Sequence, residues 1–104
     1  MKDKELLFSA IDSYALLSRT YREVLKTLIK LAIDDVVVIN IKDLSKLSNV
    51  SRPAVYAALK VLEKEKLITR NINPGSRLSS FVLKPQKFDD IIKYHSVREN
   101  ILHK

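Results

Sequence analysis

The fold of this 104-residue chain is decided by the stretch Ile41–Ile68, which reads IKDLSKLSNVSRPAVYAALKVLEKEKLI. Apolar residues recur at every third position at its start, at Ile41, Leu44 and Leu47. This spacing predicts a short helix of about two turns with one buried face. After a break the stretch returns to helical spacing, which indicates two helices packed over one shared core.

Three residues at this break favour a tight turn between the helices. Asn49 tolerates the left-handed backbone conformation that ends a helix. Ser51 is a good N-cap, and Pro53 fits the first helical turn, where its missing amide costs nothing. The second helix is therefore predicted over residues 51–66. Its buried face is formed by apolar residues at helical spacing, Val55, Leu59 and Leu62.

Three short strands are predicted around these helices. The β-branched run Val36–Ile39 predicts a strand before the first helix. Leu67–Asn71 and Leu78–Leu83 predict the two strands of a hairpin. Between them, Pro74 presets the second position of a turn, and Gly75, the only glycine of the chain, supplies the positive φ of the third.

Helical patterns flank this core on both sides. An N-terminal helix is predicted within residues 1–17, and a second helix is predicted to begin at Thr20, because Thr20 and Glu23 form a capping box. One continuous helix over Lys4–Ile33 fits the same pattern, since neither proline nor glycine interrupts it. A C-terminal helix is predicted within residues 86–104, with apolar positions Phe88, Ile91, Tyr94, Val97 and Ile101.

The charge of the chain is strongly basic and unevenly distributed. Residues 51–85 hold seven basic and two acidic residues, which accounts for most of the net charge of +7. A basic patch on a small domain suggests a polyanionic partner such as nucleic acid. On charge alone, a basic surface that only keeps the protein soluble fits equally well.

The composition predicts a single globular domain over residues 1–104. Apolar residues make up 46% of the chain, which is enough for one modest core. No apolar run is long enough to span a bilayer, so no membrane partner is expected. The chain has no cysteine, which excludes disulfides and fits a cytoplasmic location.

The order of elements and the pattern of Ile41–Ile68 resemble the helix-turn-helix of winged-helix DNA-binding domains, such as MarR-type, PadR-type and TrmB-type bacterial and archaeal regulators. The resemblance covers residues 20–84 and departs from the usual pattern at Asn49, where glycine is common. It implies a mostly α fold with a small β-hairpin wing, that is, a winged helix-turn-helix with extra N- and C-terminal helices. It also implies a sequence-specific double-stranded DNA-binding protein that regulates transcription.

The helix over residues 51–66 is expected to read the major groove, because a helix fits that groove and carries side chains to the base edges. Arg52 could donate two hydrogen bonds to guanine, Tyr56 could contact a thymine methyl group or a phosphate, and Lys60 is placed for the backbone. The residues expected on this open face are Ser51, Arg52, Pro53, Tyr56 and Lys60.

A second group of residues is expected to contact the DNA backbone or the minor groove. The first helix of such motifs crosses the backbone, and a wing over residues 70–80 lies along the minor groove or the phosphates. Arg19 and Arg22 are expected on a solvated face instead. The expected backbone and wing contacts are Lys42, Lys46, Arg70, Asn73, Ser76 and Arg77.

The two terminal helices are expected to form a homodimer interface, because regulators of this kind read two half-sites as symmetric dimers. The alternative is that both helices fold back on their own domain. The residues expected at the interface are Phe8, Ile11, Tyr14, Phe88, Ile92, Tyr94 and Ile101.

No enzymatic chemistry is expected. The chain has no glycine-rich phosphate loop, and His95 and His103 have no cysteine or carboxylate cluster at ligand spacing. No catalytic residue, metal or cofactor is therefore predicted. A small-molecule effector is not expected either, because the sensor region of larger regulators is missing.

Three alternatives to a transcriptional regulator remain at this point. One is a DNA-binding protein of plasmid or phage replication or copy control. Another is a winged-helix module that binds only proteins, because a fold does not fix a function. The third is RNA binding, which is less favoured because the chain lacks the clustered aromatic residues that stack unpaired bases.

Overall fold

The computed structural model describes residues 4–14, 17–72 and 75–102, the last five of them by their backbone alone. Within these residues the helices and strands follow one another in the order expected for a winged helix. They are α1 (Lys4–Asp12), α2 (Arg19–Leu31), β1 (Val36–Asn40), α3 (Ile41–Ser48), α4 (Arg52–Lys64), β2 (Ile68–Ile72), β3 (Leu78–Leu83) and α5 (Pro85–Leu102).

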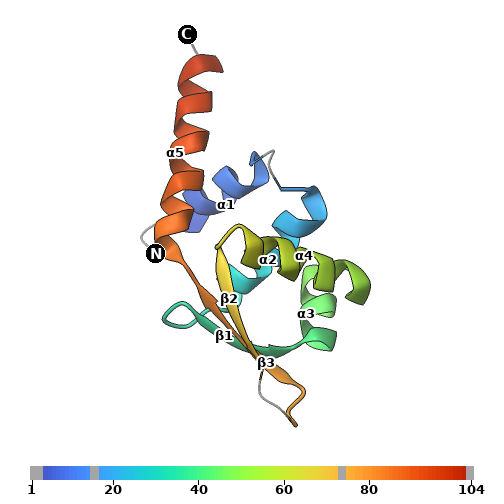
Figure 1. Ribbon diagram of the computed structural model, residues 1–104. Coiled ribbons are helices and arrows are strands. Elements are labelled where there is room, and N and C mark those ends of the chain that lie inside the picture. The colour runs from blue at the N-terminus through green and yellow to red at the C-terminus, as the bar shows by residue number, and fades with distance from the viewer. Residues whose placement is uncertain (1–3, 15–16, 73–74, 103–104) are drawn as a thin grey trace.

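The helices α2, α3 and α4 gather on one side of the sheet, and α5 extends away from this body beside α1 (Figure 1). The chain is therefore elongated along α5, with overall extents of 54 × 26 × 22 Å. None of the described helices is long and apolar enough to cross a membrane.

The sheet has the antiparallel order β1-β3-β2. The predicted hairpin of β2 and β3 is confirmed, with Arg70 opposite Phe81. The sequence did not predict that β1 joins this sheet, where Val38 lies opposite Ser80 of β3. This pairing ties the segment before α3 to the wing, so the wing is held at a fixed place relative to both helices of the motif.

The turn between α3 and α4 has the predicted structure. Asn49 ends α3 with φ 57° and ψ 42°, a left-handed conformation that asparagine tolerates better than most residues. The hydroxyl of Ser51 accepts a hydrogen bond from the amide of Ala54 at 3.4 Å, and Pro53 lies in the first turn of α4. Helix α4 ends at Lys64, slightly before the predicted end.

The start of α2 differs from the prediction. The N-cap is Ser18, whose hydroxyl accepts from the amide of Tyr21 at 3.3 Å, so the predicted capping box of Thr20 is wrong. The carboxylate of Glu23 instead pairs with Lys26 at 3.1 Å. Because α1 ends at Asp12, the alternative of one continuous helix through this region is also wrong.

One core residue of α3 was predicted incorrectly. Leu47 is 59% exposed, because α3 packs through Ile41, Leu44 and Ser48. The hydroxyl of Ser48 donates to the carbonyl oxygen of Leu44 at 2.7 Å, which satisfies this polar group inside the core. The predicted inner face of α4, Val55, Leu59 and Leu62, is buried.

The terminal helices α1 and α5 pack on each other. The hydroxyl of Ser13 and Nδ1 of His95 are 2.8 Å apart, and the rings of Tyr14 and Tyr94 meet edge to face with centroids 5.5 Å apart. A further ion pair joins α1 to α2, with Nζ of Lys26 lying 2.7 Å from Asp12.

The prediction of a dimer surface is wrong for two residues, because packing of α1 and α5 buries them within their own chain. Ile11 and Phe88 are buried in the core of their own chain, at 0% and 1% exposure. Tyr94 and Val97 lie further along α5 and are exposed, at 41% and 59%. The side chain of Ile101 lies outside the described residues.

Candidate nucleic-acid interface

Helix α4 turns a polar face away from the core. The side chains of Val55 and Leu59 hold its inner face, which leaves the opposite face to solvent. Because α4 begins at Arg52, its first backbone amides and the positive end of its dipole lie beside this polar face. All five residues expected to read bases are exposed: Ser51, Arg52, Pro53, Tyr56 and Lys60.

A groove of about 490 Å³ lies between this face, the start of α3 and the wing. None of the residues that line it is acidic, and four of them are cationic. Six of the residues predicted from the sequence lie together here, although they come from three different elements (α3, α4 and β2) and the wing loop. The lining residues are Asn40, Ile41, Lys42, Arg52, Tyr56, Arg70, Ile72, Ser76, Arg77 and Ser79.

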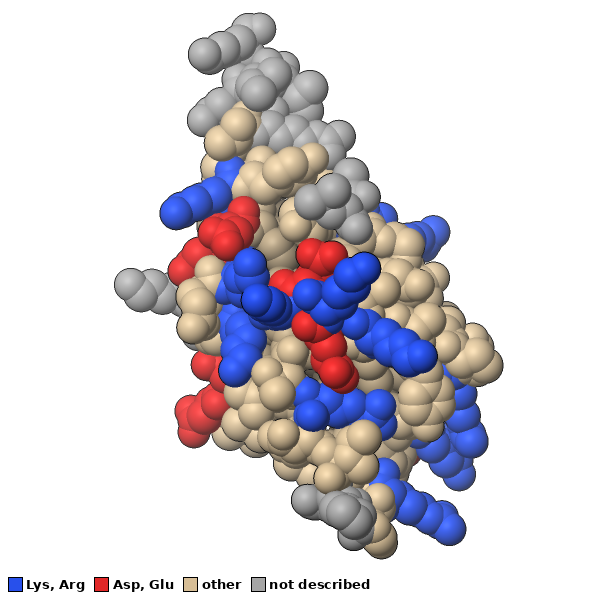
Figure 2. Space-filling model, in the orientation of Figure 1, with Lys and Arg blue, Asp and Glu red and all other residues tan. Residues whose placement is uncertain are grey.

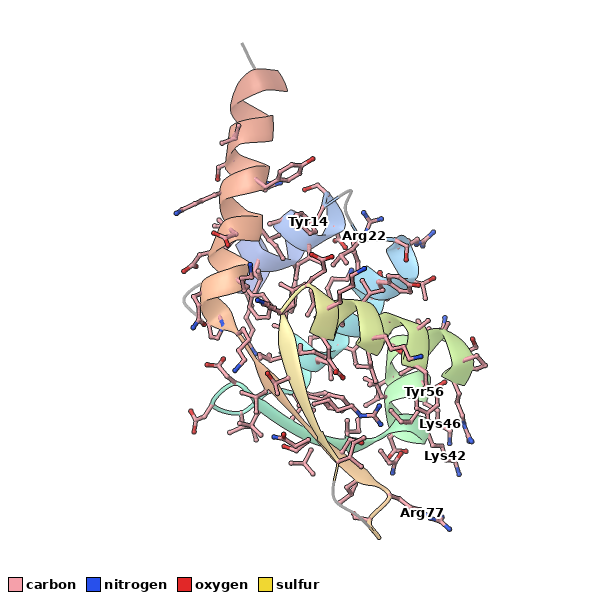
Figure 3. All side chains as sticks on the ribbon, in the orientation of Figure 1. Tyr14, Arg22, Lys42, Lys46, Tyr56 and Arg77 are labelled. Atoms are coloured by element: carbon pink, nitrogen blue, oxygen red, sulfur yellow. The ribbon has the colours of Figure 1, made fainter. Side chains whose placement is uncertain are left out.

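The basic surface extends beyond the groove. Lys42, Lys46, Tyr56 and Arg77 lie on the same side of the molecule, which is also the side of the wing (Figure 3). In the space-filling view, basic side chains without acidic neighbours follow the right and lower edges of the visible face, where α3 and the wing are located (Figure 2). Asp43 of α3 is exposed as well, but the cations of α3 and the wing outnumber it, and a net positive surface attracts polyanions.

Arg70 has an unexpected environment for a residue predicted on the wing surface. Its side chain is half-buried, with the guanidinium carbon 5.8 Å from the ring centroids of both Tyr56 and Phe81. Nη2 donates to the hydroxyl of Ser79 at 3.2 Å, while Nε is buried without a hydrogen-bond partner among the described residues. The groove thus contains a cation that is partly desolvated.

The other predicted contact residues lie at the end of the wing loop or outside the groove. Arg77 and Ser76 are exposed, and the hydroxyl of Ser76 accepts from the amide of Leu78 at 3.1 Å, which holds the end of the wing loop. Asn73 lies outside the described residues. Lys46 and Lys60 are exposed but do not line the groove.

Arg19 is exposed, as expected, and lines a second groove of about 370 Å³ that also contains the acidic residue Glu23. The helix-turn-helix turn contributes Ser48, Asn49 and Val50 to this groove. Only the tertiary packing of α2 against α3 brings Arg19 there, so no local pattern could have shown it. Arg22 points elsewhere and donates from Nη1 to the carbonyl oxygen of Tyr14 at 3.3 Å.

No protein-family model matches the chain, and no curated protein matches it either. Solved structures do match. The chain is similar to BpsR of Bordetella bronchiseptica, whose DNA binding is regulated by 6-hydroxynicotinic acid. The TM-score is 0.60 at 17% identity, over 96% of this chain and 69% of BpsR.

Two further solved structures have the same arrangement. A possible transcriptional regulator from Methanosarcina mazei Go1 matches with a TM-score of 0.57 at 17% identity, over 99% of this chain and 85% of that one. The YusO protein of Bacillus subtilis matches with a TM-score of 0.57 at 18% identity, over 92% of this chain and 69% of that one. With the element order and the sheet described above, these matches confirm the predicted fold: the chain is a winged helix-turn-helix with an added helix at each end.

Proposed function

We propose that this protein binds double-stranded DNA and regulates transcription. The observation that carries the proposal is the groove lined by four cations and no carboxylate, which lies directly beside the exposed face of α4. Similarity of fold to BpsR and to a possible transcriptional regulator supports it, although a fold by itself does not fix a function.

In this proposal α4 enters the major groove and the wing follows the backbone or the minor groove. Arg52 and Tyr56 are exposed on α4 and reach base edges, which gives sequence preference. The cations Lys42, Lys46 and Arg77 contact phosphates, which gives affinity and fixes the register of the protein on DNA.

We propose further that the DNA-binding form is a homodimer built through α5. Most of this helix projects from the body of the chain (Figure 1), and Val97 on it is 59% exposed. Two copies joined there would present two α4 helices to two half-sites, as symmetric winged-helix dimers do. Sedimentation measurements on the whole chain test this, and a monomer at concentrations where DNA is bound would contradict it.

The expectation that no small molecule controls the protein has lost support. DNA binding of BpsR, which is similar to this chain over most of its length, is regulated by 6-hydroxynicotinic acid. We therefore propose that a small organic acid controls DNA binding by this protein as well. Measuring DNA affinity with and without 6-hydroxynicotinic acid and related acids tests this, and affinities that none of them changes would contradict it.

The test of DNA binding is a salt series on random-sequence duplex DNA. The logarithm of affinity should fall with the logarithm of salt concentration, with a slope of about −0.9 for each phosphate contacted. Arg52→Ala and Arg77→Ala should both weaken binding. Lys66→Ala is the matched control, because Lys66 is an exposed cation beyond the far end of α4 and outside the groove.

Either result of this series is informative. If Arg52→Ala and Arg77→Ala weaken binding while Lys66→Ala does not, a selection for the preferred site should follow, and Arg52→Ala should blur that preference. No binding by the unaltered protein at low salt would contradict the proposal and would favour a winged helix that binds proteins. A replication or copy-control role shares the DNA contacts and would be recognised by co-purification with a polymerase.

A further inference from the structure

We propose that the groove between α3, α4 and the wing seats one phosphate group, with Arg70 as its partly buried cation. A phosphate of this kind has two sources, the DNA backbone and free inorganic phosphate. The first source rests on the proposed function, whereas the second does not.

The charge of Arg70 is not neutralised within the described part of the chain. No carboxylate there forms an ion pair with it. Its hydrogen bond is made to the neutral hydroxyl of Ser79, and two ring faces flank it at 5.8 Å. Ring faces and a hydroxyl stabilise a guanidinium less than an anion does, so this cation lacks a full counterpart.

Partial burial makes such a cation a stronger anion ligand than an exposed lysine. Arg70 has already lost part of its hydration in the folded chain, as the burial of Nε shows. An incoming anion therefore displaces less water from it and is attracted in a medium of lower dielectric constant. The side chain of Arg70 is also already ordered, since Tyr56 and Phe81 flank it, so anion binding loses less conformational entropy.

The other groups of the groove fit a phosphate. Arg52, Arg77 and Lys42 add three cations, and guanidinium groups match the spacing of phosphate oxygens with paired N–H donors. Ser76 and Tyr56 contribute hydroxyl groups to the same lining. No carboxylate lines the groove to repel an anion.

The first experiment measures the salt dependence of binding to a random 20-base-pair duplex for Arg70→Gln and Arg70→Lys. Arg70→Gln should reduce the steepness of the salt dependence by about 0.9, because one phosphate contact is lost. Arg70→Lys should keep the steepness of the unaltered protein, since it keeps the charge. Lys66→Gln is the matched control and should leave it unchanged, because Lys66 is an exposed cation beyond the far end of α4 and outside the groove.

The second experiment observes the Nε–H resonance of Arg70 by NMR during titration with inorganic phosphate and, separately, with the duplex. Chloride at equal ionic strength is the control anion. The Arg70 resonance should shift with phosphate and with duplex but not with chloride. Ser79→Ala should weaken the response to phosphate, because the guanidinium loses the hydrogen bond that orients it.

The outcomes distinguish failure of the phosphate site from failure of the proposed DNA-binding function. If the unaltered protein does not bind duplex but phosphate still shifts the Arg70 resonance, the proposal of DNA binding is wrong. The groove is then a binding site for free phosphate. If Arg70→Gln remains folded by circular dichroism, binds duplex more weakly and keeps the full steepness, Arg70 only positions its neighbours and the proposal is overturned. If Arg70→Gln does not fold, the NMR titration decides, and an unmoved resonance with both probes overturns the proposal.

Discussion

The guanidinium of Arg70 on β2 lies against the ring of Tyr56 on α4, 5.8 Å from its centroid. This contact joins the wing to the helix that we propose reads DNA. The same guanidinium lies 5.8 Å from the ring of Phe81 on β3, which is fully buried, so the contact continues into the core. The position of the wing relative to α4 is therefore set by side chains as well as by the sheet.

The contact with Arg70 gives Tyr56 a measurable part in stability although it is 48% exposed. Tyr56→Phe keeps an aromatic face beside Arg70, whereas Tyr56→Ala removes it. We expect Tyr56→Ala to lower the free energy of unfolding by about 0.5–1 kcal/mol more than Tyr56→Phe does. Urea unfolding followed by circular dichroism measures this difference, and equal stabilities of the two variants would contradict the contact.

Two leucines of the helix-turn-helix should respond very differently to truncation. Leu59 of α4 is 1% exposed and Leu47 of α3 is 59% exposed. Leu59→Ala should lower the free energy of unfolding by about 2–5 kcal/mol, because it leaves a cavity in the core. Leu47→Ala should cost under about 1 kcal/mol, as for most exposed positions. Thermal unfolding of both variants tests the pair, and similar losses would show that Leu47 is buried after all.

Local chemistry made much of the fold predictable. The turn between α3 and α4 depends on residues close in sequence, namely Asn49 with its left-handed backbone and Ser51 with its capping hydroxyl. The hairpin depends on a short loop that contains Gly75, with φ 80°. Each of these features is set within a few residues, so sequence patterns report it directly.

Competition between neighbouring residues limited the prediction at the start of α2. Ser18 and Thr20 both carry hydroxyl groups that cap helices, and the pattern favoured Thr20 because Glu23 completes a capping box. In the structure Ser18 is the cap, and Glu23 pairs with Lys26 instead. Two local solutions were available, so the local pattern alone did not decide between them.

The groove itself could not be predicted, because it depends on contacts between distant segments. Pairing of β1 with β3 brings the start of α3, with Lys42, beside the wing and Arg77. The sequence predicted Lys42 as a backbone contact and Arg77 as a contact of the wing to the backbone or the minor groove, but nothing local indicated that they line one groove. Arg70 was predicted at the surface of the wing, whereas the structure half-buries it between two rings.

The conformation of Asn49 predicts an unusual order of stability for its variants. With φ 57°, this residue is in the left-handed region, where most residues with a Cβ cost about 1–2 kcal/mol. Asn49→Gly should keep the stability of the unaltered protein or raise it, and Asn49→Ala should lower the free energy of unfolding by about 1 kcal/mol. Chemical denaturation of the two variants is the measurement. An alanine variant as stable as the glycine variant would be inconsistent with a strained backbone at this position.

The junction of α1 and α5 should make stability depend on pH in the alkaline range. Burial raises the pKa of Tyr14 above its usual value of 10.0, and the negative charges of Glu65, of ionised Tyr94 and of Asp90 raise it further. Above about pH 10 the folded chain therefore holds the proton of Tyr14 more tightly than the unfolded chain does. Stability contributed by this group is fully present below pH 10 and is lost as the pH rises through the raised pKa.

The substitution Tyr14→Phe isolates this contribution, since it keeps the ring that meets Tyr94 at 5.5 Å and removes the titrating hydroxyl. We expect the free energy of unfolding to fall less steeply from about pH 9 to about pH 11.5 in this variant than in the unaltered protein. Tyr56→Phe is the matched control, because Tyr56 is an exposed tyrosine on α4, away from the junction. Identical pH profiles for the Tyr14 variant and the unaltered protein would mean that the hydroxyl of Tyr14 titrates alike in the folded and unfolded chains, and that α5 does not shield it.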